Sequence, residues 1–405
     1  MKKILVLGGA GGIGQVATKT VIASDTFEAI TIADLNLETL EQFRAELNNP
    51  KISALQIDAN ESLVSTIADF DIVVNCIGPF YKYGPKILQE AIEAGVTYVD
   101  VCDDLDATEK QLSFNQMAVD NGVCAVIGLG NSPGLANLLV KYAADNLYDE
   151  IKEVDIMHIH GGESFEGGAV IKHRIHAMVN DVPVFDQSQF KMVRLLESSG
   201  QEYVENCEFK DVGIYPVFPY PHPETITLPK EFPSLVKVTN RGVVFPFEYF
   251  EFTMETVRQG LANMSDPTQM DKDIDDWTNS ILSSRAGFLK DHNVTTPKGC
   301  LKVVTKGEKK GQNYQYIFSV SSDSEGAGAG TGIPAGIGAV LLSEQNARKH
   351  GVFAPESIID PMTALELAGN IIPKLNISVG SSSGSSLPVN ITEISPDGTV
   401  TDIAL

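Results

Sequence analysis

The sequence predicts an α/β protein with a doubly wound parallel sheet, followed by a second α+β domain that is built on a mixed, largely antiparallel sheet. Two observations predict this class. Short apolar runs alternate with helical patterns over residues 1–130, as in parallel sheets that are covered by helices on both faces. Beyond Glu150 the pattern changes to β-branched and proline-rich segments, which favour antiparallel strands and turns. A chain of 405 residues is long enough for two or three domains.

The first apolar run, Ile4–Leu7, predicts a buried strand that leads into a glycine-rich turn and then a helical pattern. Its glycines have the G-x-G-x-x-G spacing of dinucleotide-binding turns. Such glycines allow a tight bend and a close approach of backbone to pyrophosphate, while the helix N-terminus offers N–H groups to the phosphates. The alternative is an ordinary strand-to-helix turn. We expect a Rossmann domain whose cofactor-binding turn contains Gly9, Gly11, Gly12, Ile13 and Gly14.

The rest of the first domain is predicted as alternating strands and helices. The further expected strands are Ala29–Ala33, Ile52–Ile57, Ile72–Ile77, Tyr98–Cys102 and Cys124–Leu129. The expected helices include Leu37–Leu47, Leu63–Ala68, Lys86–Ala94 and Glu109–Asp120. Ligands of open parallel sheets bind at the carboxyl ends of the strands. The residues that follow each apolar run are therefore the candidates for binding and catalysis.

The second strand ends at Asp34, which lies 20 residues after Gly14, where an acidic side chain can accept hydrogen bonds from the adenosine ribose. Leu35 and Asn36 follow, with no adjacent Arg or Lys to neutralise a 2′-phosphate. We therefore expect NAD to be preferred, with NADP as the alternative cofactor. Asp34 is alternatively the N-cap of the helix Leu37–Leu47.

The ends of the third and fourth strands supply further candidate cofactor contacts. Asp58 and Ala59 stand where the adenine is usually contacted. After the fourth strand, a Gly-Pro turn lets backbone lie along the ribose–nicotinamide half of the cofactor, or is simply a sharp turn. The expected contacts there are Cys76, Gly78, Pro79 and Phe80.

A cluster of carboxylates lies at the carboxyl end of the fifth strand, at Asp100, Asp103 and Asp104. Paired carboxylates can transfer protons or hold an ammonium group. Alternatively, they cap the helix that begins near Leu105.

The chain beyond the first domain is expected to form a substrate-binding α+β domain at residues 131–338 and C-terminal helices at 339–405. Glu153–His160 predicts a strand, and Leu301–Lys306 with Tyr314–Ser321 predicts a hairpin. The glycine-rich run 326–338 precedes an expected helix, Ala339–Arg348, whose start permits close packing on the first domain. The Ser/Gly run Ser381–Ser386 predicts a mobile tail.

Histidines and arginines of the second domain are candidates for substrate contacts. His158, His160, His173 and His176 lie close in sequence, but without HExxH or a cysteine partner they are expected to line a pocket or the surface rather than hold a metal. A site that grips an amino-acid carboxylate usually needs an arginine. The candidates for that anchor are Arg174 and Arg241.

Composition argues against several classes of partner. A net charge of −23 argues against nucleic acid and against anionic membrane surfaces, and leaves a cationic substrate such as a polyamine open. The five cysteines include no CxxC pair, which favours free thiols in a reducing cytosol; a catalytic thiol is the alternative. We find no signal peptide and no apolar run that could span a bilayer, and expect a cytoplasmic protein.

Several stretches together resemble the saccharopine dehydrogenase-like family of NAD(P)-dependent oxidoreductases. The resemblance implies a Rossmann domain, a mixed-sheet second domain that also forms a homodimer, and final helices that pack back on the first domain. It places the cofactor on the glycine turn, on Asp34 and on the turn after the fourth strand. The matching stretches are Leu5–Gly14, Val73–Phe80, Ala91–Asp100, Gly130–Leu139, His222–Glu224, Thr227–Pro229, Gly330–Ile337 and Gly351–Pro355.

The expected function is hydride transfer between a nicotinamide cofactor and a C–N bond of an amino-acid-derived imine or secondary amine. Asp103 is the candidate for proton transfer or ammonium binding near the nicotinamide, with Tyr83 as a second catalytic candidate. A short-chain dehydrogenase is an alternative, but its Tyr-x-x-x-Lys motif occurs only as Tyr148–Lys152, past the sixth strand. A protein that senses a dinucleotide without catalysis is the other alternative.

Overall fold

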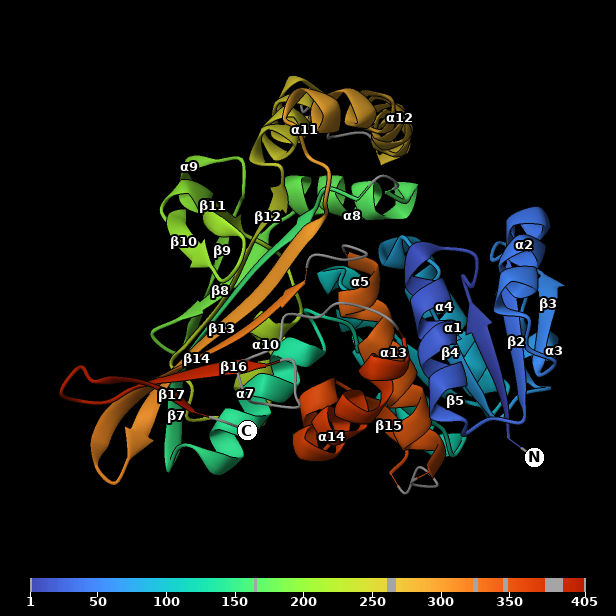
Figure 1. Cartoon of the computed structure of the whole chain (residues 1–405), viewed down its shortest axis with the longest axis horizontal. Helices are drawn as coiled ribbons and strands as arrows, with labels where there is room; N and C mark the ends of the chain where they lie inside the picture. Colours follow the sequence, from blue (N-terminus) through green and yellow to red (C-terminus); the bar gives the residue numbers. More distant parts are fainter. Residues whose placement is uncertain are drawn as a thin grey trace. The chain divides into compact units, whose positions relative to one another are not determined.

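The computed structural model describes residues 2–163, 166–260, 267–322, 327–344, 349–375 and 389–403. These residues belong to two units, which are described separately below (Figure 1). The first unit comprises Met1–Leu138 and Gly328–Ile377, and the second comprises Leu139–Ala327 and Ser378–Leu405. The run Ser381–Ser386, predicted as a mobile tail, lies outside the described residues.

The first unit is built on a parallel sheet of seven strands, counted over the described residues, in the order β15-β6-β5-β4-β1-β2-β3. The six predicted strands are present, and their order is that of a Rossmann sheet. A short strand from the C-terminal part of the chain extends the sheet beside β6, which the apolar pattern alone did not predict. The strands are β1 (Lys3–Leu7), β2 (Ala29–Asp34), β3 (Ile52–Gln56), β4 (Ile72–Asn75), β5 (Thr97–Asp100), β6 (Cys124–Val126) and β15 (Gly351–Phe353).

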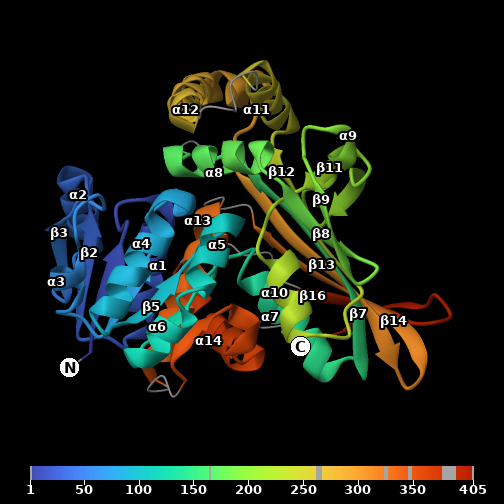
Figure 2. The same ribbon diagram turned by 180° about the vertical axis from the view of Figure 1, so that it is seen from behind.

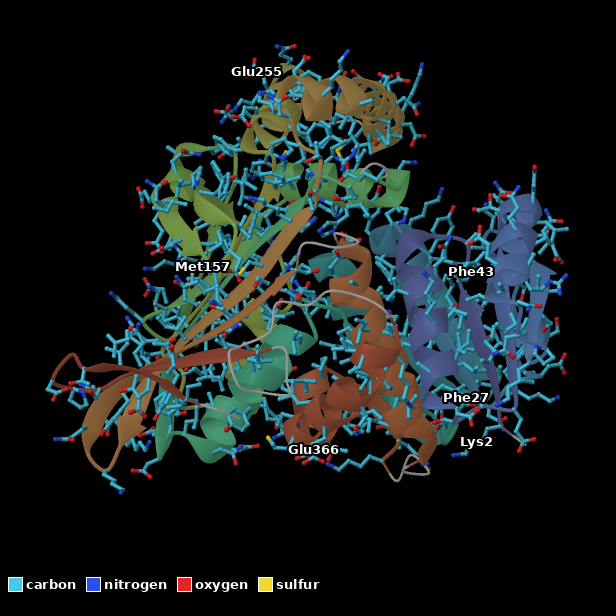
Figure 3. All side chains as sticks on the ribbon, viewed as in Figure 1. Lys2, Phe27, Phe43, Met157, Glu255 and Glu366 are labelled. Atoms are coloured by element: carbon cyan, nitrogen blue, oxygen red, sulfur yellow. The ribbon has the colours of Figure 1, made fainter. Side chains whose placement is uncertain are left out.

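Alternate residues of each strand enter two different apolar layers. Ile4 and Val6 of β1 pack into one layer, whereas Leu5 and Leu7 pack into the other. Both faces of the sheet are therefore buried, as the continuous apolar run predicts. Phe27 and Phe43, labelled in Figure 3, belong to the layer of Ile4.

Helices cover both faces of this sheet. The layer of Ile4 includes residues of α1 (Gly12–Ser24), α2 (Leu37–Leu47), α13 (Ala327–Glu344) and α14 (Pro361–Ile371). The opposite layer includes residues of α3 (Val64–Ile67), α4 (Phe80–Glu93) and α6 (Asn115–Asp120). The remaining short helices of the unit are α5 (Leu105–Leu112), η2 (Pro355–Ser357) and η3 (Ile372–Lys374).

Helix α13 differs from its prediction. The glycine-rich run was expected to precede a helix at Ala339, but the helix already begins at Ala327. Three of its glycines are spaced four residues apart and face α1. A Cβ at Gly332 would lie 2.6 Å from the carbonyl oxygen of Ile13, and one at Gly336 would lie 2.6 Å from Cγ2 of Thr20. Close backbone packing against α1 thus outweighs the low helix propensity of glycine.

The second unit contains a sheet of ten strands, counted over the described residues. Only β7 and β12 pair in parallel, and every other pairing is antiparallel, so the predicted mixed, largely antiparallel sheet is confirmed. The strands are β7 (Glu150–Gly161), β8 (Val182–Asp186), β9 (Gln189–Val193), β10 (Glu205–Phe209), β11 (Gly213–Pro219), β12 (Lys237–Phe245), β13 (Lys298–Lys309), β14 (Gln312–Ser322), β16 (Asn390–Ile394) and β17 (Val400–Ile403).

An apolar core lies where this sheet meets α8, α11 and α12 of the same unit, which lie beside one another in Figure 2. Met157 of β7, labelled in Figure 3, belongs to that core. The helices are α8 (Gly168–Val179), α9 (Ser198–Gln201), α10 (Glu224–Glu231), α11 (Phe247–Gly260) and α12 (Pro267–Asp291); α7 (Leu135–Asn146) contains the boundary between the units.

The last part of the chain differs from the expected set of C-terminal helices. Helix α14 belongs to the first unit, but β16 and β17 join the sheet of the second unit, where β16 pairs with β14. Within the described part of the chain, no helix combines the length and the apolar character that crossing a bilayer requires.

The packing of α13 on α1 leads to a stability prediction. Gly332→Ala forces one of the two helix backbones to move, which should destabilise the protein by about 1–2 kcal/mol. The matched control is Gly287→Ala on the exposed side of α12, where a Cβ meets nothing within 4 Å. There alanine should be neutral or stabilise by up to about 1 kcal/mol. Chemical denaturation of both variants measures the difference, and equal stabilities would contradict this packing.

Candidate functional site

The turn between β1 and α1 is closed by backbone contacts that exclude side chains. A Cβ at Gly14 would lie 2.1 Å from the carbonyl oxygen of Gly8, and one at Gly9 would lie 2.9 Å from Cβ of Ile32. Gly8 itself has a φ of +75°, and its Cβ would meet the backbone of Cys76 at 2.8 Å. The left-handed residue of the turn is therefore Gly8 rather than Gly9, and Gly8 brings the loops after β1 and β4 together.

The N-terminus of α1 is suited to bind an anion. The helix begins at Gly12, its N-cap Gly11 provides no side-chain cap, and no acidic residue stands in its first turn. The first N–H groups of a helix have no intrahelical acceptor, and among the described residues no acceptor is found for those of Gly12, Ile13 and Gly14. A Cβ at Gly12 would meet no atom within 4 Å, so this side of the turn is open. These features fit a pyrophosphate.

Asp34 lies next to this turn at the end of β2. Its Oδ2 accepts a hydrogen bond from the backbone N–H of Ala10 at 3.1 Å, and its Oδ1 accepts one from that of Asn36 at 3.2 Å. The N-cap of α2 is Asn36, whose side chain accepts a hydrogen bond from Thr39. Asp34 is therefore not the helix cap, which was the alternative to the ribose role.

The end of β3 lies beside Asp34, because the N–H of Ile57 donates to the carbonyl oxygen of Asp34 at 3.0 Å. Asp58 closes the turn that follows, accepting hydrogen bonds from the backbone and side-chain nitrogens of Asn60, both at 2.8 Å. The hydroxyl of Tyr83 donates to Oδ1 of Asn60 at 3.4 Å. Tyr83 thus lies at the turn that follows Asp58 and Ala59, on the expected adenine side of the cofactor.

The loop after β4 is positioned by Asn75. Its Oδ1 accepts a hydrogen bond from the N–H of Ile77 at 2.9 Å, and its Nδ2 donates to the hydroxyl of Tyr98 at 2.9 Å. Burial raises the pKa of the Cys76 thiol to about 12, so this cysteine is a neutral thiol rather than a nucleophilic thiolate. Gly78, Pro79 and Phe80 complete the loop: Pro79 is the N-cap of α4 and Phe80 is its first residue.

The acidic cluster after β5 divides into separate roles. Asp100 is fully buried and accepts hydrogen bonds from four donors: Tyr98, Cys102, Gln111 and Gly128. Burial raises the pKa of Asp100, while these donors favour the charged form. It therefore holds together the ends of β5 and β6.

The two other carboxylates lie in different surroundings. Asp104 is buried and accepts a hydrogen bond from the N–H of Tyr81 at 2.8 Å, so its side chain caps α4 rather than the helix that follows it. Asp103 is half-buried at the same strand end. Its catalytic role, like that of Tyr83, stays a prediction.

The residues predicted to bind the cofactor lie along one edge of the parallel sheet. Strands β4, β1, β2 and β3 are neighbours, and because they are parallel their carboxyl ends lie along the same edge. The residues predicted to bind the cofactor follow these four strands, and the direct contacts described above join the neighbouring loops.

In the second unit, Arg241 of β12 is paired with protein carboxylates. Its guanidinium contacts Asp155, and its Nη2 lies 2.7 Å from Oε1 of Glu205. These two partners make Arg241 less suited to gripping a substrate carboxylate.

Arg174, the other predicted anchor, is almost completely buried in α8 and forms an ion pair with Glu166. Glu166 also accepts hydrogen bonds from Nη1 of Arg285 and from the hydroxyl of Tyr249, both at 2.9 Å. Although burial alone would raise the pKa of Glu166, the charges of Arg174 and Arg285 lower it overall. Nη1 of Arg174 is buried and has no hydrogen-bond acceptor among the described residues.

Three of the predicted histidines gather near this cluster, together with His222. The rings of His158 and His222 are stacked at 4.9 Å, those of His158 and His160 lie 6.4 Å apart, and those of His173 and His222 lie 5.6 Å apart. Burial lowers the pKa of His158 to about 3 and, together with the charge of Arg174, that of His160 to about 4. Both rings are therefore neutral at neutral pH.

Glycine makes room for one of these rings. A Cβ at Gly242 would lie 2.2 Å from Cε1 of His158. The ring nitrogen Nε2 of His158 lies 3.1 Å from Oδ1 of Asn240, whose Nδ2 donates to Glu224 at 3.2 Å. Sequence reasoning did not select Asn240, Glu166, Tyr249 or Arg285, because no local pattern joins them to the histidines.

Comparison with known proteins supports the resemblance to the saccharopine dehydrogenase-like family. Residues 4–126 match the family model described as the saccharopine dehydrogenase NADP binding domain. Residues 4–126 thus resemble the cofactor-binding domain of the saccharopine dehydrogenase-like family. The chain is 24% identical to carboxyaminopropylagmatine dehydrogenase of Synechocystis over 394 residues, which cover 92% of this chain and 96% of that protein. It is 27% identical to carboxynorspermidine synthase of Vibrio cholerae over 254 residues, which cover 55% of this chain and 58% of that protein.

A solved structure has the same fold. The saccharopine dehydrogenase (L-Glu forming) of Saccharomyces cerevisiae superposes with a TM-score of 0.65 and 14% identity, covering 94% of this chain and 99% of that one. The predicted fold class, the resemblance to the family and the prediction of an NAD(P)-dependent oxidoreductase are confirmed. The same comparisons support a nicotinamide cofactor and a small-molecule substrate.

The buried histidines predict a loss of stability in acid. His160 has a lower pKa in the folded protein than its ordinary value of 6.5, so the unfolded chain binds its proton first. The stability that the neutral ring of His160 contributes to the folded protein is complete above about pH 6.5 and is lost as the pH falls toward 4. When the pH is lowered from 7 to 5, the free energy of unfolding of the wild type should fall by about 2 kcal/mol more than that of His160→Leu.

Denaturation at both pH values measures this difference. The control is His350→Leu, because His350 is exposed. If His160→Leu and the control lose the same stability as the wild type, His160 is not held neutral by the fold.

Proposed function

We propose that the protein is an NAD(P)-dependent dehydrogenase that interconverts an imine and a secondary amine in a carboxylated polyamine. The observation that carries this proposal is the similarity to carboxyaminopropylagmatine dehydrogenase, which extends over 92% of the chain. It includes the second unit, which contains Arg174 and the histidines. The partial match to carboxynorspermidine synthase supports the same substrate class.

In this proposal the first unit binds the cofactor. The N–H groups at the start of α1 bind the pyrophosphate, the carboxylate of Asp34 accepts hydrogen bonds from the ribose, and the loop after β4 orients the nicotinamide half. When bound, the nicotinamide supplies or accepts the hydride at the C–N carbon. Asp103 is proposed to hold the substrate ammonium or to transfer its proton. Tyr83 is the second and weaker candidate, because its hydroxyl contacts Asn60 at the turn after β3, on the expected adenine side.

The charge of the chain supports a cationic substrate. Its net charge of −23 attracts a polycation and raises its rate of encounter at low ionic strength. A carboxylated polyamine also needs a cationic contact for its carboxylate, and the buried guanidinium of Arg174 is the candidate.

Cofactor preference, oligomeric state and cellular location are also proposed. We propose a preference for NAD, because the carboxylate of Asp34 repels a 2′-phosphate and the next residue is Leu35, which is 63% exposed. The description of the matching family model names NADP, so both cofactors need to be measured.

We propose a homodimer on the basis of the family resemblance, to be tested by sedimentation. A cytoplasmic location is supported by five free cysteines, and fractionation of the source cells tests it.

The function is tested by following oxidation of NADH and NADPH. Agmatine and short diamines are each combined with aldehydes that carry an amino-acid group, and control reactions lack the amine. We expect turnover only when aldehyde and amine are both present. In the same assay, Asp103→Asn should lower turnover at least about tenfold without changing cofactor binding. Absence of turnover with every pair, despite cofactor binding, would contradict the proposed reaction, and unchanged turnover of Asp103→Asn would remove Asp103 from it.

Cofactor preference is tested at Asp34. The double variant Asp34→Ser, Leu35→Arg removes the repelling carboxylate and adds a cation, so kcat/KM should shift toward NADPH by about 100-fold or more relative to NADH. Leu35→Arg alone is the matched control and should shift the ratio less. If the wild type already prefers NADPH, or if the double variant leaves the ratio unchanged, Asp34 does not select the cofactor.

A further inference from the structure

We propose that Arg174 and His160 form a carboxylate-binding subsite in the second unit, which recognises the carboxylate of the substrate. This inference rests on the proposed function for the identity of its ligand. Its geometry comes from the second unit alone. Glu166, Tyr249 and Arg285 are positioning residues in this subsite, because they act through the guanidinium of Arg174.

The first observation is an unused donor in the interior. Arg174 is 1% exposed, and its Nη2 donates to Glu166. Its Nη1 is buried without an acceptor among the described residues. A buried guanidinium N–H group without an acceptor is costly, so a ligand oxygen at this position would recover a charge-assisted hydrogen bond.

The second observation is a neighbouring ring nitrogen in the same condition. Nδ1 of His160 is buried without a partner among the described residues. The ring of His160 belongs to the group of histidine rings that reaches His173, the residue before Arg174 in α8. A neutral imidazole can carry its proton on Nδ1 and donate it. Two donors from different elements, α8 and β7, can thus serve the two oxygens of one carboxylate.

The surroundings fix the orientation of Arg174. Glu166 is held by Arg285 and Tyr249, and Arg285 also donates to the carbonyl oxygen of Glu163 at 2.6 Å. The guanidinium of Arg174 lies 5.5 Å from the ring centroid of Tyr249, and that of Arg285 lies 5.1 Å from it. With one side of its guanidinium fixed on Glu166, Arg174 presents Nη1 in a defined direction.

The charges favour a carboxylate over a more highly charged anion. Glu166 already faces both arginines, and Glu163 lies 3.5 Å from Nη2 of Arg285. Two carboxylates near two guanidinium groups disfavour a dianion such as phosphate. A single negative charge that accepts from Arg174 and His160 is compatible with this balance.

The test compares two ligands that differ only by the carboxyl group, carboxyaminopropylagmatine and aminopropylagmatine. Calorimetric titration of the full-length protein with bound dinucleotide gives the ratio of their affinities. We expect the wild type to bind the carboxylated compound at least about tenfold more tightly. Arg174→Gln and His160→Leu should each bring this ratio close to one, with little change for aminopropylagmatine.

The matched control is Lys172→Gln, which removes a cation from the same helix where Lys172 pairs with the exposed Asp275. It should keep the wild-type ratio. Circular dichroism establishes whether each variant is folded. If Arg174→Gln does not fold, His160→Leu alone tests the subsite. A wild type without preference for the carboxylated ligand, or a folded His160→Leu variant that keeps the full preference, would overturn the subsite.

The outcomes separate the subsite from the proposed reaction. Binding preference that depends on Arg174 and His160, but without turnover of any amine–aldehyde pair, supports the subsite and contradicts the reaction. Turnover with a preference that neither variant changes supports the reaction and contradicts the subsite.

Discussion

The first unit depends on backbone atoms approaching one another where β1 turns into α1. A side chain on Gly14 would collide with the carbonyl oxygen of Gly8, and one on Gly8 with the backbone of Cys76. These contacts fix the start of α1 at the edge of the sheet and leave its N–H groups open. Helix α13 supports the same helix from another side, because Gly332 lets its backbone contact Ile13. The anion-binding turn is thus a product of tertiary packing as well as of local spacing.

Buried polar groups position the neighbouring loops. Asp100 accepts hydrogen bonds from four donors, one of which, the N–H of Gly128, joins β5 to the loop after β6, and Asn75 joins β4 to Tyr98. In the second unit, Glu166 is held by Arg174, Arg285 and Tyr249, whereas one nitrogen each of Arg174 and His160 has no partner among the described residues. Satisfied networks stabilise a fold, whereas buried donors without acceptors cost stability unless a ligand serves them.

The sequence predicted the parts of the fold that depend on local spacing. The glycine turn, Asp34 and the six strands of the first domain follow from periodicity and from residues a few positions apart. The glycine run before Ala339 was wrongly placed outside a helix, because propensity cannot anticipate the close approach of α1. The cluster of Glu166, Arg174, Tyr249 and Arg285 joins three distant parts of the chain, so no local pattern could predict it. The carboxylates after β5 could be located, but only their burial assigned Asp100 and Asp104 to structural roles.

The central claim, that the start of α1 binds the pyrophosphate of a nicotinamide dinucleotide, is tested most directly by titrating Gly12→Asp with NADH and NADPH. A side chain at Gly12 meets no neighbour, and an acidic residue suits the first turn of a helix, so folding should be preserved. The isosteric Gly12→Asn is the control. The account predicts that aspartate weakens binding at least about tenfold more than asparagine does. Equal affinities of the two variants for both nucleotides would contradict it.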